Sequence, residues 1–263
     1  MVLMLLMTVP AQLVVLGLGA VGVQGRLVES LAHLLVFVTL LGIVWLVRTR
    51  WEGDPATYLA LGGGAGRALT RLEVGIGVAI VLVGSQLALI ALLGYADPNA
   101  PVLTGADLAV MALWTFTVSF LLQGLPEEIL WRGYLQTTLM SRLSPITSAI
   151  LTAVFFGSMH VVSFGSGGTW DSKLVYALTA MAMGLVMAGL RLVTGSTWAA
   201  IGYHAGWHLV SRTPALFGVQ VAVPPPVWLQ LLPGILELLA GVALLVWWRR
   251  THRGSAAVPS SRS

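Results

Sequence analysis

About eight apolar segments, each roughly 20 residues long, occupy most of the 263-residue chain and constrain its fold more than any other feature. A helix that crosses the hydrocarbon core of a bilayer needs about 20 predominantly apolar residues. The expected spans are residues 2–23, 29–47, 74–95, 105–124, 145–163, 173–191, 196–211 and 228–248. Only 9% of the residues are charged, against roughly 25% in a typical soluble domain. We therefore expect an all-α, polytopic membrane protein with about eight transmembrane helices.

These helices leave little of the chain for a separate soluble domain. We expect a single integral membrane domain over residues 1–253, followed by a disordered cytoplasmic tail over residues 254–263. The first apolar segment has no charge before Arg26 and is too long for the core of a cleaved signal peptide, so we interpret it as a retained span. The chain has no cysteine, which excludes disulfides, thiolate metal sites and a cysteine nucleophile.

The basic residues alternate between successive connections and do not form one patch. The connections on the side of the two termini hold Arg48, Arg50, Arg67, Arg71, Arg132, Arg142, Arg191, Arg249, Arg250, Arg253 and Arg262, whereas the others hold Arg26, Lys173 and Arg212. By the positive-inside rule, this distribution places both termini in the cytoplasm. We then expect the loop 164–171 to lie outside, in a position to border a substrate entrance. The net charge of +4 reflects this orientation, and we expect no nucleic-acid partner.

Two adjacent acids, Glu127 and Glu128, lie in the middle of this apolar chain. An ionisable side chain within lipid is costly and marks a functional site by default. Glu128 and Arg132 are four residues apart, so on a helix they share a face and can form an ion pair. Glu127 lies on another face and is left to accept a proton. In the alternative interpretation, Gly124 and Pro126 open a new interfacial helix whose first turn favours acids.

A histidine follows in the next apolar segment, within Phe156-Gly-Ser-Met-His160. Phe156 and His160 share a helix face, and Gly157 and Ser158 are small enough to admit a neighbouring helix. The alternative is that His160 is only a hydrogen-bond partner for a neighbour. We interpret the other polar intramembrane residues as hydrogen-bonding groups between helices: His33, Gln86 and Glu237.

Two further histidines, His204 and His208, stand four residues apart in a later apolar segment. They point the same way from one helix, as the two histidine ligands of a zincin do, but Ala205 occupies the position of the zincin glutamate. The same geometry also serves two imidazole donors directed at one developing oxyanion. The alternative is simple packing.

The three motifs occur in the order Glu-Glu-x-x-x-Arg, Phe-x-x-x-His and His-x-x-x-His, each on a separate expected helix. In this the sequence resembles the CPBP intramembrane proteases, the family of type II CAAX prenyl endopeptidases and bacteriocin-processing enzymes. The family's third motif is His-x-x-x-Asn, so His208 stands where Asn is usual. The resemblance covers about residues 105–212. It implies a multi-pass protein of a bacterial cell membrane, with helices that enclose an intramembrane active-site cavity.

The resemblance also implies an activity, that of an endopeptidase acting within the bilayer on a membrane-associated peptide or protein substrate. Glu127 would be the general base, and His160 would be its partner in activating a water. His204 and His208 would hold the oxyanion. The supporting residues would be Glu128, Arg132 and Phe156.

The catalytic type and two other functions stay open. Glu127, His160, His204 and His208 also form a zinc ligand set, so the type is either a glutamate protease or a metalloprotease, and no other cofactor is implied. A non-catalytic membrane protein of bacteriocin-immunity type would keep the helices and tolerate Glu127→Gln. A proton-coupled transporter would use the acids and histidines as a proton relay.

Overall fold

The computed structural model describes residues 2–47, 49–50, 59–97, 99, 101–162, 168–221 and 227–252. These residues form α1 (Val2–Ala20), α2 (Arg26–Val47), α3 (Gly64–Leu92), β1 (Ala96–Asp97), α4 (Gly105–Thr117), the π-helical turn η3 (Val118–Gly124), α5 (Leu125–Glu128), the π-helical turn η4 (Ile129–Gln136), α6 (Thr137–Met140), α7 (Pro145–Met159), the 3-10 turn η5 (His160–Val162), α8 (Trp170–Thr194), α9 (Thr197–Leu216), β2 (Gln220–Val221) and α10 (Val227–Thr251). The tail expected over 254–263 and residues 164–167 of the expected outer loop lie outside the described residues.

Six helical segments are long and apolar enough to cross a membrane: Arg26–Val47, Gly64–Leu92, Gly105–Met140, Pro145–Val162, Trp170–Thr194 and Trp228–Thr251. The all-α, polytopic membrane fold is therefore confirmed, whereas the count of eight spans is not. The described apolar stretch of α1 is short, at Val9–Ala20. Helix α9 carries His204, His208 and Arg212, and it is largely buried inside the bundle, so it lacks the continuous apolar surface of a lipid-facing helix.

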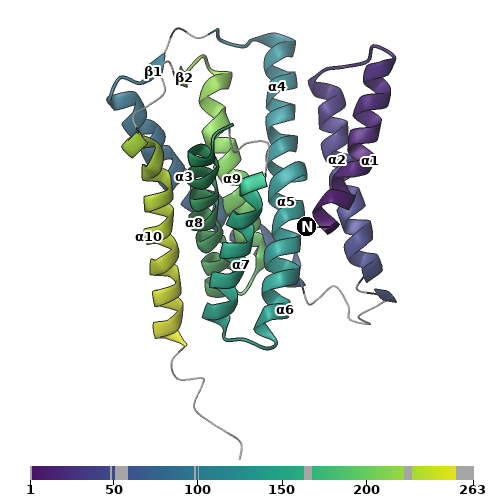
Figure 1. Ribbon diagram of the computed structural model, residues 1–263. Helices are drawn as coiled ribbons and strands as arrows, with labels where there is room; N and C mark the ends of the chain where they lie inside the picture. The colour runs from purple at the N-terminus through teal and green to yellow at the C-terminus, as the bar shows by residue number, and fades with distance from the viewer. Residues whose placement is uncertain are drawn as a thin grey trace, which may run out of the picture.

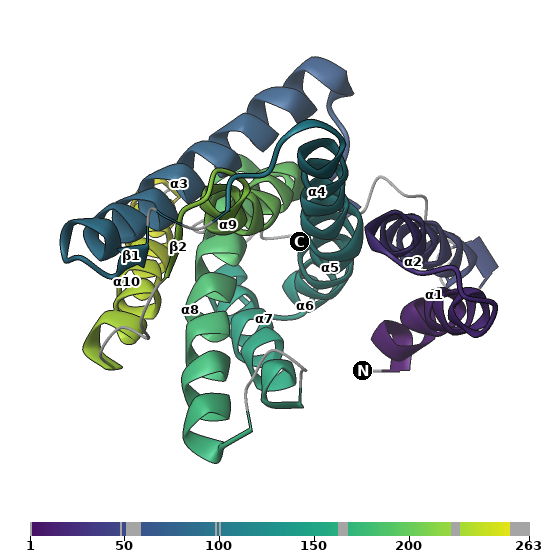
Figure 2. The same ribbon diagram turned by 90° about the horizontal axis from the view of Figure 1, so that it is seen from above.

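The helices form one bundle with two distinct ends (Figure 1). Helix α9 packs along α3, α8 packs between α7 and α10, and α2 packs on α4 with α1 beyond it (Figure 2). The strands β1 and β2 pair at one end, which we call the strand end, where α8 and α10 also begin. The opposite end, where α10 terminates at Arg249 and Arg250, we call the basic end.

The acidic pair lies within one continuous helical run of 36 residues, Gly105–Met140. Pro126 has no N–H to donate and would normally break an α-helix, but the π-helical turns η3 and η4 lie directly before and after α5. The wider turns accommodate the proline without ending the helix. The interpretation in which Gly124 and Pro126 open a new interfacial helix is therefore wrong.

Glycines let the helices that carry the motifs approach one another closely. A Cβ added to Gly202 on α9 would collide with the backbone of Leu72 on α3. A Cβ added to Gly157 on α7 would lie 2.6 Å from the Cβ of Met181 on α8. The helix contact predicted at Gly157 is confirmed. The prediction for Ser158 is wrong, because this residue is exposed and its hydroxyl donates back to the carbonyl of its own helix.

The isolated polar residues mostly join helices, as predicted. His33 on α2 is hydrogen-bonded through Nδ1 to the hydroxyl of Thr117 on α4 at 3.1 Å. The Tyr203 hydroxyl on α9 donates to Glu237 on α10 at 2.9 Å. Within the described part of the chain the Gln86 side chain makes no hydrogen bond to another helix, so that prediction is wrong.

Candidate active site

Glu128 and Arg132 form the ion pair expected from their spacing, and both side chains are 0% exposed. Arg132 Nη1 donates to Glu128 Oε1 at 2.8 Å, and Nη2 donates to the carbonyl of Gly184 on α8 at 2.9 Å. Gly184 leaves room for the guanidinium, since an added Cβ would lie 3.3 Å from Arg132 Nη2 and 3.1 Å from Ala153 Cα. The pair therefore attaches the acidic helical run to α8 at a point where α7 also packs.

Glu127 differs from its neighbour in having no such partner. Oε2 of each glutamate is buried and makes no hydrogen bond to any described residue, but Glu128 is paired through Oε1 and Glu127 is not. The Glu127 carboxylate lies close enough to His204 and Arg132 for the charges to interact. A buried carboxylate oxygen without a partner is costly, and a carboxylate that acts as a base must have an oxygen available for a proton.

Phe156 is 1% exposed and contacts side chains of all three motifs. Its ring centroid lies 4.7 Å from Cζ of Arg132 and 4.6 Å from the His160 ring. The His204 ring meets it edge-on, with 5.9 Å between centroids. The second motif therefore contacts both of the others, which explains why an aromatic residue suits this position.

His160 follows the last turn of α7, where it begins η5. Its Nδ1 is hydrogen-bonded to the backbone carbonyl of Phe156 at 2.7 Å. A carbonyl oxygen only accepts, so Nδ1 carries the proton of the neutral ring. Nε2 then holds a lone pair that can accept a hydrogen bond from a water.

His204 and His208 stack on one face of α9, with 5.2 Å between ring centroids. His204 Nδ1 is bonded to Glu128 Oε1 at 2.8 Å, so this atom carries a proton and Nε2 holds the lone pair of the neutral ring. His208 is the reverse, because its Nδ1 accepts from the Arg212 guanidinium, which only donates. The neutral His208 ring therefore carries its proton on Nε2 and can donate from there.

The three histidines share one cavity of about 480 Å³. It is lined by Gln123, Phe156, His160, Asp171, Ser172, Val175, Tyr176, Thr179, Ala180, Met183, His204, Trp207, His208 and Gln230. Of the four predicted catalytic residues the structure thus brings His160, His204 and His208 to the cavity wall. Glu127 is not among the lining residues.

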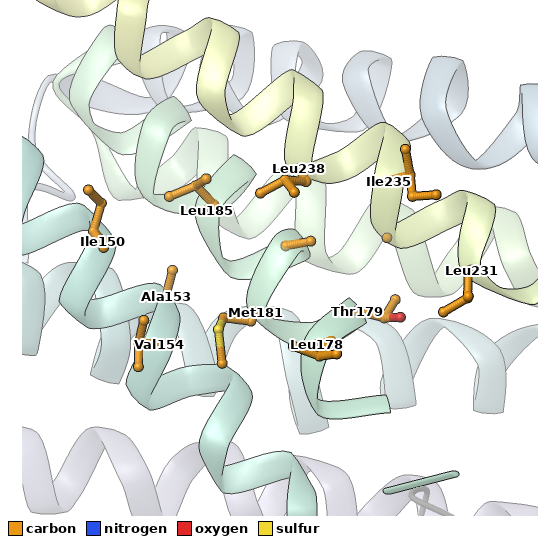
Figure 3. A pocket seen from close by; sticks show the side chains of 12 residues that line it. Ile150, Ala153, Val154, Leu178, Thr179, Met181, Leu185, Leu231, Ile235 and Leu238 are labelled. Atoms are coloured by element: carbon orange, nitrogen blue, oxygen red, sulfur yellow. The ribbon is translucent and has the colours of Figure 1, made fainter. Parts of the chain in front are cut away.

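A second cavity, of about 570 Å³, lies between α7, α8 and α10. Figure 3 shows aliphatic side chains around it, among them Leu185, Ile235 and Leu238. Thr179 is the only described lining residue of this cavity with a hydroxyl, and it lines both cavities. Among the described lining residues of this second cavity none has a titratable side chain.

The arrangement does not fit the zinc ligand set of Glu127, His160, His204 and His208. Across the described ranges, no three histidine, aspartate or glutamate side chains are placed to hold a metal ion. His208 Nδ1 accepts from the Arg212 guanidinium, so Nε2 of the neutral ring carries a proton and offers no lone pair to a metal ion. A protein-held zinc ion needs at least three such ligands around one point.

Several supporting residues were missed at the sequence level. Arg212 is four residues beyond His208, and that spacing could have identified it. Gly184 carried no recognisable signal, because its role depends on contact with a distant helix.

Ala205 is fully buried, and a Cβ added to Gly124 would lie 2.8 Å from the Ala205 Cβ. The zincin glutamate is therefore sterically excluded at position 205.

Residues 109–210 match the family model described as type II CAAX prenyl endopeptidase Rce1-like. The match extends from α4 into α9 and includes all three motifs. It confirms the family that the motifs predicted, and that family implies a CAAX-type peptide hydrolase. No curated protein matches the chain, and no solved structure does.

Proposed function

We propose, from the Rce1-like family to which residues 109–210 belong and from the cavity geometry, that this protein is an intramembrane endopeptidase. It hydrolyses a peptide bond of a membrane-associated substrate with a water activated by Glu127 and His160. The observation that carries the proposal is the single cavity lined by three histidines from two helices. Each ring is held through Nδ1, so its Nε2 atom is left for substrate or water.

The first step is attack of water on the scissile carbonyl carbon. Glu127 takes one proton from the water, and the lone pair on His160 Nε2 accepts a hydrogen bond that orients it. A C–O bond forms, and the carbonyl oxygen becomes an oxyanion. The assignment of Glu127 rests on its carboxylate, which unlike that of Glu128 forms no ion pair with a described residue, and on the family motif, since Glu127 does not line the cavity.

The oxyanion is stabilised by α9. His208 donates from Nε2 in its neutral form, with Arg212 holding the ring. His204 donates from Nε2 only as an imidazolium, a form that the Glu128 carboxylate stabilises at 2.8 Å. When the tetrahedral intermediate collapses, the C–N bond breaks and the leaving nitrogen takes the proton from Glu127. No covalent enzyme intermediate is formed.

The test compares cells that express the wild type, Glu127→Gln or Glu73→Gln. Glu73 is an exposed acid of α3 outside the cavity, so it is the matched control. Quantitative proteomics of the membrane fraction should find uncleaved precursors in the Glu127→Gln cells alone. Identical cleavage in all three would refute the protease and favour the immunity-type alternative.

A further inference from the structure

The cavity with the three histidines reaches only one end of the bundle. Asp171 and Ser172, which line it, lie in the first turn of α8 and are exposed. Gln230, which also lines it, lies in the first turn of α10. Both helices begin at the strand end (Figure 1). None of the described lining residues comes from the basic end.

The basic end is closed beneath α9. Residues 59–61 pass under its first turn, and four hydrogen bonds hold this contact. Thr197 N–H donates to Ala60 O at 3.0 Å and its hydroxyl to Leu59 O at 2.7 Å. The Ser196 hydroxyl donates to Ala60 O at 3.3 Å, and Trp198 Nε1 donates to Leu61 O at 2.9 Å. Ser196 and Thr197 are both 0% exposed. Residues 59–61 therefore cover the first turn of α9 at the basic end.

Charge distinguishes the two ends. The described basic residues at the closed end are Arg50, Arg67, Arg71, Arg142, Arg191, Arg249 and Arg250, whereas the open end has Arg26, Lys173 and Arg212. Basic residues close to membrane helices are retained on the cytoplasmic side. The closed end therefore faces the cytoplasm, and the mouth at Asp171 and Ser172 faces outward.

We infer that the cavity receives its substrate from the non-cytoplasmic side of the membrane. The substrate class is an exported or membrane-anchored polypeptide whose scissile bond enters from the outer leaflet or the space beyond it. A peptide segment confined to the cytoplasm does not reach the three histidines. The substrate class in this inference rests on the proposed endopeptidase activity, whereas the side of access rests on the fold alone.

The natural absence of cysteine allows a direct test of direction. Ser172→Cys places a thiol at the cavity mouth, and Ser141→Cys places one at an exposed position of the basic end as the matched control. Intact cells are treated with a membrane-impermeant sulfonated maleimide. We expect the Ser172→Cys thiol to react at least about tenfold faster than the Ser141→Cys thiol, with the difference lost after permeabilisation, because labelling requires a water-accessible thiolate. The opposite order, or equal rates in intact cells, overturns the inference.

Two additions keep this test independent of catalysis and of folding. The labelling is repeated with Glu127→Gln in each background, where the same pattern is expected because the direction of access does not depend on turnover. Asp171→Cys replaces Ser172→Cys if the latter yields no folded protein, with the same result expected.

The substrate side is tested with the cleaved proteins themselves. The cleavage sites lost in Glu127→Gln cells should map to segments outside the cytoplasm. Sites mapping to cytoplasmic segments would refute this inference and leave the protease intact. If no cleavage site is lost in the Glu127→Gln cells but the Ser172→Cys thiol is still labelled from outside, the proposed protease activity is refuted and the inferred direction of access stands.

Discussion

Replacement of Arg132 by methionine should destabilise the fold strongly, because the guanidinium satisfies two buried acceptors at once. It donates to the Glu128 carboxylate at 2.8 Å and to the Gly184 carbonyl at 2.9 Å, with both ionic side chains fully buried. A hydrogen bond to a charged group contributes about 1.5–3 kcal/mol. Removing one partner of a buried pair costs about 3–5 kcal/mol, and we expect Arg132→Met to lose that much.

The double variant Glu128→Gln with Arg132→Met tests whether this loss comes from leaving the Glu128 charge without its partner. It removes both charges of the ion pair, so neither is left buried without the other, and the Gln side-chain oxygen can still accept from His204 Nδ1. The double variant still loses the hydrogen bond that Arg132 donates to the Gly184 carbonyl. We expect its free energy of unfolding to be at least about 1.5 kcal/mol higher than that of Arg132→Met alone. The free energy of unfolding can be measured in mixed micelles with increasing denaturing detergent, followed by the fluorescence of the ten tryptophans. A double variant no more stable than the single one would refute the stranded-charge argument.

Three other predictions concern chemistry and packing. Glu127→Gln and His160→Ala should each lower turnover of an identified substrate at least about a hundredfold, while Glu127→Gln keeps the wild-type unfolding transition; wild-type turnover would remove Glu127 from the mechanism. Ala205→Glu should give no folded protein in detergent, since the space beside Gly124 is filled, whereas Ala205→Gly should fold; a folded glutamate variant would show that α5 and α9 can separate. His208→Asn should keep activity within about tenfold, because its amide N–H replaces the Nε2–H donor, whereas His208→Ala should lose about 2–4 kcal/mol of transition-state stabilisation. Elemental analysis should find no stoichiometric zinc in the wild type, and stoichiometric zinc that disappears with activity in His208→Asn would reverse the oxyanion assignment.

Local features of the chain were predictable from sequence. Ser144 and Pro145 begin α7 with the Ser144 hydroxyl accepting from the Thr147 N–H at 3.1 Å, as cap chemistry requires. The Glu128–Arg132 pair also follows from i, i+4 spacing. Both depend on residues within one turn of each other, so no knowledge of the tertiary fold is needed.

Other features depend on contacts between distant segments and were missed for that reason. Residues 196–211 were expected as a span, but their apolar length did not reveal that α9 is largely enclosed by α3 and other helices. Pro126 suggested a helix start, but the π-helical turns on either side absorb it. The bond between Glu128 and His204 joins positions 76 residues apart, and spacing along one helix cannot reveal it.

The hydrogen-bond partners of the histidines also change how the third motif should be interpreted. The family resemblance assigns His204 and His208 one shared role at the oxyanion, yet the two rings are protonated differently when neutral. Arg212 directs a proton to Nε2 of His208, whereas Glu128 draws the proton to Nδ1 of His204. His208 is thus a ready donor, and His204 becomes one only when it gains a second proton beside Glu128. In the proposed mechanism a histidine can take the place of the family's Asn because its Nε2–H supplies the N–H donor that the Asn amide would supply.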